Sequence, residues 1–207
     1  MIKGNISRVN FLCVFIVLFF CETIISQEWS LAKEKNGVKV FTRKIPGWGI
    51  KEYKVIFQVK SSLKKVIRIL KDVPSRYHWI HNTIEVREIA RPNSDIVFIY
   101  NRINAPWPVS DRDNITKFSF SYPSNKSVRI DMQVIITHAK APIYDGIVRI
   151  RRLEGHWLIN DKDNGYIEII QQCVAEPGGN IPDWLANSAA VDSPYNSMYN
   201  LKKYIER

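Results

Sequence analysis

Residues 181–207 read IPDWLANSAAVDSPYNSMYNLKKYIER, and this stretch sets the fold class that the chain can adopt. Pro182 suits the first turn of a helix, where a missing amide donor costs nothing, and apolar residues then recur at spacings that one helix face allows. Those apolar residues are Leu185, Ala189, Met198, Leu201 and Ile205. The first half of the segment carries small residues at Ala186, Ser188, Ala189 and Ala190. The stretch therefore predicts one long helix whose first half carries small side chains.

The chain ahead of this helix is dominated by strand periodicity. Apolar and polar residues alternate in residues 53–59 and 128–136, which is typical of strands with one buried face. Similar segments cover residues 38–45, 84–91, 96–103, 115–122, 147–160 and 165–176. Short turns such as RPNSD and YPSNK separate several of them, as antiparallel hairpins require. We therefore predict a mostly antiparallel sheet of about eight strands.

One further segment, SSLKKVIRILKD at residues 61–72, has helical spacing. Ser61 or Ser62 can cap its start, and Pro74 ends it. The predicted order is two strands, a helix, six strands and the final helix. A long antiparallel sheet curled around one long helix is an α+β layer architecture. The small residues of the final helix either leave a cavity against the sheet or permit close packing there, and the sequence does not choose between them.

The N-terminus has the pattern of a secretory signal peptide. Lys3 and Arg8 precede the apolar run FLCVFIVLFFC, which is too short for the ~20 residues of a membrane span. We expect cleavage near Ser26, an exported protein in the periplasm or outside the cell, and one domain over residues 27–207. A lipoprotein signal at Cys21 is disfavoured because Phe20 precedes it. Cys173 is then the only cysteine left, which excludes an intramolecular disulfide.

The formal net charge of +10 favours an anionic partner. No long run of Lys and Arg like those of nucleic-acid-binding arms occurs, so a phospholipid surface is a better match than nucleic acid. Arg149 and Arg151 lie on the same face of one predicted strand. That face is either a solvated outer surface or a patch for anionic headgroups.

The stretch NAPWPVSDRDNI at residues 104–115 places a charge triplet directly after a rigid turn. Pro106 and Pro108 fit a connection between strands, so the triplet opens a strand. Because successive side chains of a strand point to opposite faces, Asp111 and Asp113 point one way and Arg112 the other. The residues alone allow either a solvated turn or a strand in which Arg112 points inward while the two acids remain solvated.

Three patterns in this order resemble the START (StAR-related lipid transfer) domain, of the helix-grip, Bet v 1-like superfamily. They are DVPSRYHWIHNTIEV at 72–86, PWPVSDRD at 106–113 and EPGGNIPDWLANSAAVDSPYNSMYNLKKYI at 176–205. The likeness runs from about Trp29 to Ile205 and is closest to the stand-alone START proteins of bacteria.

The resemblance implies a hydrophobic tunnel between the curved sheet and the C-terminal helix, holding one sterol, phospholipid or similar lipid. Family members move such lipids without transforming them, and the C-terminal helix with its neighbouring loops acts as the lid. The family's buried ion pair falls on Glu85 and Arg112 at the inner end of the cavity. No motif here matches a member with a known ligand preference, so the resemblance does not identify the lipid.

Candidate ligand-binding residues follow from the apolar faces, although each can equally be plain core. They are Tyr53, Phe57, Phe98, Tyr100, Met132, Val134, Ile150, Ile169, Leu185 and Ala189. Gly178 and Gly179 form a candidate hinge, and Trp184 belongs to the lid region one helical turn away.

The sequence favours a monomeric lipid carrier that visits membranes, with no cofactor, no metal and no catalytic residue. One alternative is a polyketide cyclase/aromatase-like or hydrolase-like enzyme of the same fold, in which Glu85, Arg112 or a cavity histidine polarises a substrate. The histidines at 78, 81, 138 and 156 match no metal-ligand spacing, His78-x-x-His81 being the nearest approach. A second alternative is a basic envelope-binding protein with a filled core.

Overall fold

The computed structural model describes residues 28–179 and 181–207. The signal peptide predicted for residues 1–26 lies outside the described residues.

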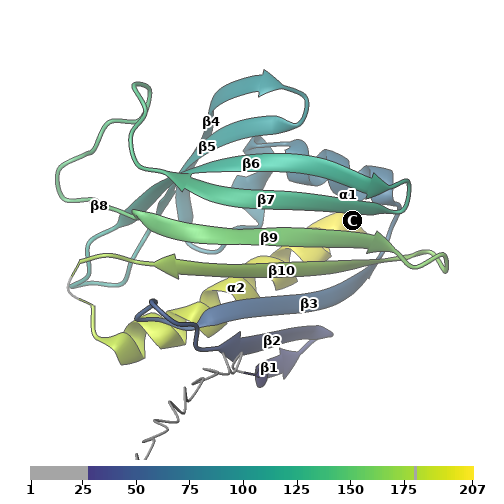
Figure 1. Ribbon diagram of the computed structural model, residues 1–207, viewed down its shortest axis with the longest axis horizontal. Coiled ribbons are helices and arrows are strands. Elements are labelled where there is room, and N and C mark those ends of the chain that lie inside the picture. Colours follow the sequence, from purple (N-terminus) through teal and green to yellow (C-terminus); the bar gives the residue numbers. More distant parts are fainter. Residues whose placement is uncertain (1–27, 180) are drawn as a thin grey trace, which may run out of the picture.

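Ten strands form a single curved sheet in the described part of the chain (Figure 1). Its order is β1-β2-β3-β10-β9-β7-β6-β5-β4, all antiparallel, with β8 parallel to the start of β6. The strands are β1 (Ser30–Lys35), β2 (Val38–Arg43), β3 (Glu52–Lys60), β4 (Thr83–Asn93), β5 (Ile96–Ile103), β6 (Arg112–Ser124), β7 (Ser127–Ile135), β8 (Val148–Arg149), β9 (Arg152–Asp161) and β10 (Tyr166–Glu176).

Two strands differ from the prediction made from the sequence: β1 was not predicted, and β8 and β9 were predicted as one strand. β1 is a mostly exposed edge strand, so its residues do not alternate between apolar and polar. The predicted strand 147–160 is interrupted between Arg149 and Arg152, where the chain leaves β6 and joins β7 and β10.

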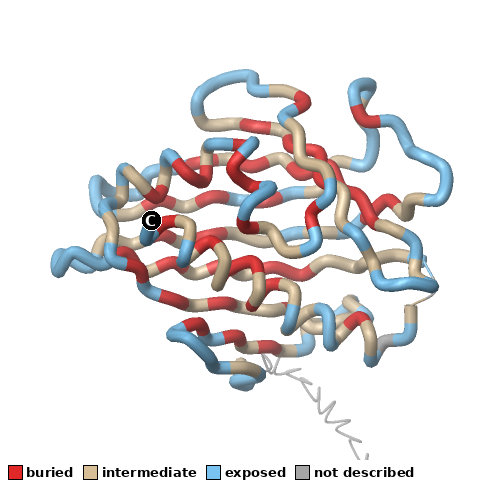
Figure 2. Tube along the Cα trace, turned by 180° about the vertical axis from the view of Figure 1, so that it is seen from behind, coloured by how far each residue is buried: buried red, intermediate tan, exposed pale blue. Residues whose placement is uncertain are grey.

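The helices lie on one side of this sheet (Figures 1 and 2). α1 (Leu63–Lys71) is capped by Ser62, whose hydroxyl oxygen accepts the amide of Lys65 at 3.3 Å, and a 3₁₀ turn, η1 (Pro74–His78), follows it. α2 (Asp183–Glu206) crosses behind the sheet and contacts β2 and β3. Met198, Leu201 and Ile205 of its second half are at most 2% exposed. The α+β helix-grip architecture predicted from the sequence is confirmed.

Gly155 allows β9 and β10 to approach closely in the middle of the sheet. A Cβ atom at this position would overlap the carbonyl oxygen of Gln172 and lie 2.8 Å from the Cα of Cys173. No other residue fits there without moving the backbone.

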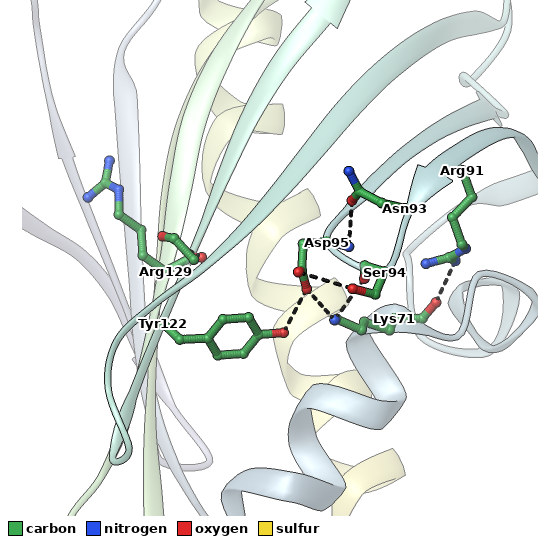
Figure 3. Close-up of polar contacts among 8 residues, drawn as sticks. Lys71, Arg91, Asn93, Ser94, Asp95, Tyr122 and Arg129 are labelled. Carbon is green, nitrogen blue, oxygen red and sulfur yellow. Dashed lines mark hydrogen bonds and ion pairs between the residues drawn. The ribbon is translucent and has the colours of Figure 1, made fainter.

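A polar network ties the end of α1 to the β4–β5 hairpin (Figure 3). The Lys71 ammonium donates to Asp95 at 2.9 Å and to the carbonyl of Ser94 at 2.8 Å, and the Tyr122 hydroxyl donates to Asp95 at 3.1 Å. Arg91 donates to the carbonyl of Lys71 at 3.1 Å, at the negative end of the helix dipole. These contacts hold the hairpin against α1.

The charge triplet at the start of β6 divides as the alternation predicts. Asp111 and Asp113 lie on the outer face, where Asp111 accepts from Arg102 at 2.6 Å. The expectation that both acids are solvated is wrong for Asp113, whose side chain is only 1% exposed and accepts two hydrogen bonds from Arg149 at 2.6 and 2.9 Å. The segment 136–147 covers this pair, because Arg149 also donates to the carbonyls of Ile136 and Pro142.

Arg149 therefore does not belong to a basic surface patch with Arg151. Arg149 is 5% exposed, whereas Arg151 is exposed. Two arginines on one face of a strand gave no indication that a loop folds over one of them.

The ion pair predicted between Glu85 and Arg112 is also wrong. A bulge between Thr83 and Glu85 inserts one residue into β4, so Glu85 lies opposite Arg102 on the outer face, whereas Thr83 lies opposite Ile103. Glu85 accepts from Arg87 at 2.9 Å instead, and Arg112 pairs with Ile103 on the inner face. Alternation counted from Thr83 without the bulge would place Glu85 on the inner face.

We expect Asp113→Ala to lower the free energy of unfolding by about 3–5 kcal/mol, because it leaves the Arg149 guanidinium buried without a carboxylate. Urea denaturation measures the change. Asp131→Ala is the control, since the Asp131–Arg129 pair on the same outer face is exposed and is worth about 1 kcal/mol or less. Equal losses in the two variants would contradict this account of the buried pair.

We expect Glu85→Ala to change the free energy of unfolding by less than about 1 kcal/mol. The Glu85 and Arg87 side chains are 42% and 33% exposed, so solvent screens their attraction. Thermal and urea unfolding test this, and a loss near 3 kcal/mol would show that Glu85 balances a buried charge after all.

Candidate functional site: a cavity between the last helix and the sheet

A cavity of about 400 Å³ lies between α2 and the inner face of the sheet. Its walls are mostly apolar and come from η1, from β3 to β7, from β9 and β10, from the loops beside them and from the first two-thirds of α2. This volume lies in the range of sites for small organic ligands. Ala186, Ala189 and Ala190 of α2 line it, so the small residues of the helix border open space instead of a close helix–sheet contact.

Five of the ten residues predicted to bind a ligand line this cavity, namely Tyr53, Met132, Ile150, Leu185 and Ala189. Phe57 and Ile169 are packed in the hydrophobic core beside it, at 2% and 0% exposure. Val134 lies opposite Thr116 on β6 but is not part of the lining.

Phe98 and Tyr100 were assigned to the wrong face of β5. They belong to a second apolar cluster with Ile89, Ile115 and Ala141, and the residues of β5 that line the cavity are Ile99, Asn101 and Ile103. Segment 136–147 covers the outer face at this point, so both faces of β5 are buried. Periodicity cannot identify the inner face of such a strand.

The charged residues in the described lining are all basic: Lys51, Arg76 and Arg112. Neither aspartate nor glutamate occurs among the lining residues that the structure describes. The cavity wall is therefore apolar with a net positive charge.

Arg76 is 4% exposed and comes from η1. Its guanidinium donates to the carbonyl of Leu70 at 3.0 Å and lies over the ring of Phe118 at 4.3 Å and that of Trp79 at 5.4 Å. Burial lowers the pKa of Arg76 to about 9, with a smaller contribution from Arg91. Arg76 thus remains protonated at neutral pH and is balanced mainly by aromatic faces.

Arg112 is 8% exposed and begins β6. Its guanidinium donates to the carbonyl of Ser110 and, at 3.3 Å, to the carbonyl of Gly178. Burial lowers the pKa of Arg112, and the charge of Asp111 on the other face of the strand opposes this shift. The side chain thus joins the turn before β6 to the glycines before α2.

In the described part of the chain, six buried side-chain atoms have no hydrogen-bond partner, and four of them belong to residues that line the cavity. They are Arg76 Nε, Trp79 Nε1, Arg112 Nε and Gln171 Oε1. Buried polar atoms are nearly always satisfied in folded proteins, so these four atoms are available to a polar group or water inside the cavity.

Two other titratable groups face the same space. Burial raises the pKa of Tyr53 well above its usual range and the pKa of Cys173 to about 12, so both are protonated at neutral pH. No histidine occurs in the described lining, and no cluster of potential metal ligands occurs in the described part of the chain.

One end of the cavity lies beside exposed loops. Gly178 and Gly179, the predicted hinge, have φ angles of 67° and 69°, which favour glycine, and they precede α2. Trp184 in the first turn of α2 is 72% exposed, and Trp107 in the turn before β6 is 92% exposed. None of the described helices is long and apolar enough to span a membrane.

Arg76 is a site residue that sequence reasoning missed. It lies in the quoted pattern DVPSRYHWI, three residues before the buried Trp79. This helical spacing could have suggested a common face, but a short turn in one sequence does not show that the arginine is buried.

The comparisons with known proteins agree with this geometry. The START domain family model matches residues 25–195. An uncharacterized protein of Pseudomonas aeruginosa is 32% identical over 88% of this chain and 89% of its own length, and the phosphatidylcholine transfer protein of Bos taurus is 22% identical over 84% and 83%.

Among solved structures, a STAR-related lipid transfer protein fragment from Xanthomonas axonopodis aligns with a TM-score of 0.78 and 27% identity, covering 86% of this chain and 99% of that chain. The Zhui aromatase/cyclase from Streptomyces sp. R1128 aligns with a TM-score of 0.55 at 12% identity over 75% of this chain and 93% of that chain, a likeness that shows the fold alone. Because the family model covers most of the sequence and the fold is that of the solved START structures, the chain belongs to the START domain family.

Proposed function

We propose that the protein binds one hydrophobic ligand in the cavity between α2 and the sheet and exchanges it at membranes. The observation that carries the proposal is the cavity itself, with its apolar walls and small α2 residues. Relatives named as a phosphatidylcholine transfer protein and a STAR-related lipid transfer protein support it. The ligand is a lipid, and no cofactor takes part.

Exchange requires a gate, and the first half of α2 is the best candidate. Its N-terminus follows two glycines in left-handed conformations, and Trp184 in its first turn is exposed. Trp107 is also exposed, in the turn before β6, and Arg112 after that turn donates to the carbonyl of Gly178. Exposed tryptophans suit a lipid–water interface, and a basic chain favours anionic membranes. We further propose that the protein is a monomer, exported after removal of residues 1–26.

The two alternatives receive less support. A cyclase-like or hydrolase-like enzyme needs a group that accepts a proton, and the described lining contains no carboxylate or imidazole. Glu85, which that alternative used, lies on the outer face. A basic envelope-binding protein with a filled core does not require a cavity of about 400 Å³.

Filling the cavity tests the binding site. We expect Ala189→Trp to weaken lipid binding about tenfold, because overpacking a cavity of fixed shape costs roughly 1–3 kcal/mol. Ser188→Trp is the matched control, since Ser188 is the neighbouring residue, is exposed and does not line the cavity. The measurement is co-purified lipid by mass spectrometry, followed by titration with a fluorescent lipid.

If neither the wild-type protein nor the Ser188→Trp variant binds any lipid, the proposed function is wrong. If Ala189→Trp binds as well as Ser188→Trp, the ligand lies elsewhere.

Locking α2 to the sheet tests the gate. The backbone amide of Lys51 donates to Asn187 Oδ1 at 3.1 Å, so the start of β3 and the first half of α2 are adjacent. We expect a disulfide in the Lys51→Cys, Asn187→Cys double variant to abolish lipid transfer between vesicles, and its reduction to restore transfer. Asn187→Cys alone is the control for loss of the hydrogen bond. Undiminished transfer by the oxidised protein would place the gate in another element.

A further inference from the structure

Three arginines are buried in the described structure, and they differ in how their charge is balanced. Arg149 lies outside the cavity and has a two-point ion pair with Asp113. Arg76 and Arg112 line the cavity, and neither has an ion pair with a described carboxylate. A buried guanidinium is costly unless an anion or several acceptors balance it.

Only the buried arginines that line the cavity lack a carboxylate partner among the described residues. On the outer face of the neighbouring strands β5 and β4, the arginines have acids: Arg102 pairs with Asp111, and Arg87 pairs with Glu85. The β4 bulge places Glu85 on that outer face. On the inner face, Arg112 lies opposite Ile103, and no described aspartate or glutamate lines the cavity there.

Arg112 is the better candidate of the two to hold an anion. Arg76 is stacked on Phe118 and Trp79, whose ring faces compensate part of its charge. Arg112 has no such ring contact among the described residues, and its guanidinium is held only by two backbone carbonyls, with Nε unsatisfied. Gly179 lies beside the guanidinium, where a Cβ would make an ordinary van der Waals contact with Arg112 Nη2 at 3.6 Å.

From this we infer that the cavity selects a lipid whose head carries a net negative charge, a phosphate or a carboxylate without a balancing cation, and that Arg112 binds that group. The inference rests on the proposed function and makes its substrate class specific. A neutral sterol or a zwitterionic head leaves the two cavity cations without an equal counter-charge. Arg76 adds a second positive charge that favours the same class of ligand.

The test offers the delipidated protein several lipids at once. Phosphatidylcholine vesicles containing dioleoyl phosphatidic acid, oleate and cholesterol are incubated with the protein, which is re-isolated, and its bound lipid is quantified by mass spectrometry. We expect phosphatidic acid or oleate to be enriched about tenfold over phosphatidylcholine, the size of one charge-assisted contact. Enrichment of the first identifies a phosphate head, and enrichment of the second a carboxylate.

Variants assign the effect to Arg112. Arg112→Gln should lose the enrichment, and Arg102→Gln should retain it, because Arg102 lies across the same strand pair on the outer face. If Arg112→Gln fails to fold, Arg112→Lys replaces it: it should retain the preference for anionic lipid, with weaker binding because the two-point fork is lost.

Bound lipid in the proportions of the vesicle, or a preference for cholesterol or phosphatidylcholine, overturns the inference and leaves the proposed function standing. Full enrichment in Arg112→Gln, or an equal loss in Arg102→Gln, overturns the assignment to Arg112. Absence of every lipid from the wild-type protein overturns the proposed function as well.

Discussion

One helix cannot fill the inner face of a ten-stranded curved sheet, and most of the structure follows from that constraint. The second half of α2 carries Met198, Leu201 and Ile205 and packs into the core. The first half carries alanines and serines, which are too small to reach the strands opposite. The same helix therefore closes the core at one end and leaves a cavity at the other.

The start of β6 distributes charge between the two sides of the sheet. Asp111 and Asp113 neutralise arginines on the outer face: the Arg102–Asp111 pair is half-buried, and the Arg149–Asp113 pair is buried beneath segment 136–147. Arg112 between them points to the cavity, where its partners in the described structure are backbone carbonyls. A buried ion pair thus neutralises charge on the outer face, while the described cavity lining retains a net positive charge. The extra residue in β4 completes this separation by keeping Glu85 outside.

The fold could be predicted to a large extent because it depends on local patterns. One of the two serines predicted to cap α1, Ser62, does so, and alternation correctly placed Arg112 on the opposite face from Asp111 and Asp113. The candidate site was only partly predictable. Phe98 and Tyr100 lie on a strand buried on both sides, where alternation carries no direction. Arg76 lies in a turn too short to show its buried face.

The sequence alone determined that an antiparallel sheet would curl around a long helix with small side chains in its first half, because the spacing of apolar and small residues is a local property. Tertiary structure decided which charges meet. The bulge after Thr83, the fold of segment 136–147 over Arg149 and the glycines beside Arg112 each depend on contacts between residues far apart in the chain. A single added residue in a strand moves the side chains after it to the opposite face of the sheet. The alternation of apolar and polar residues does not reveal where such a residue is inserted.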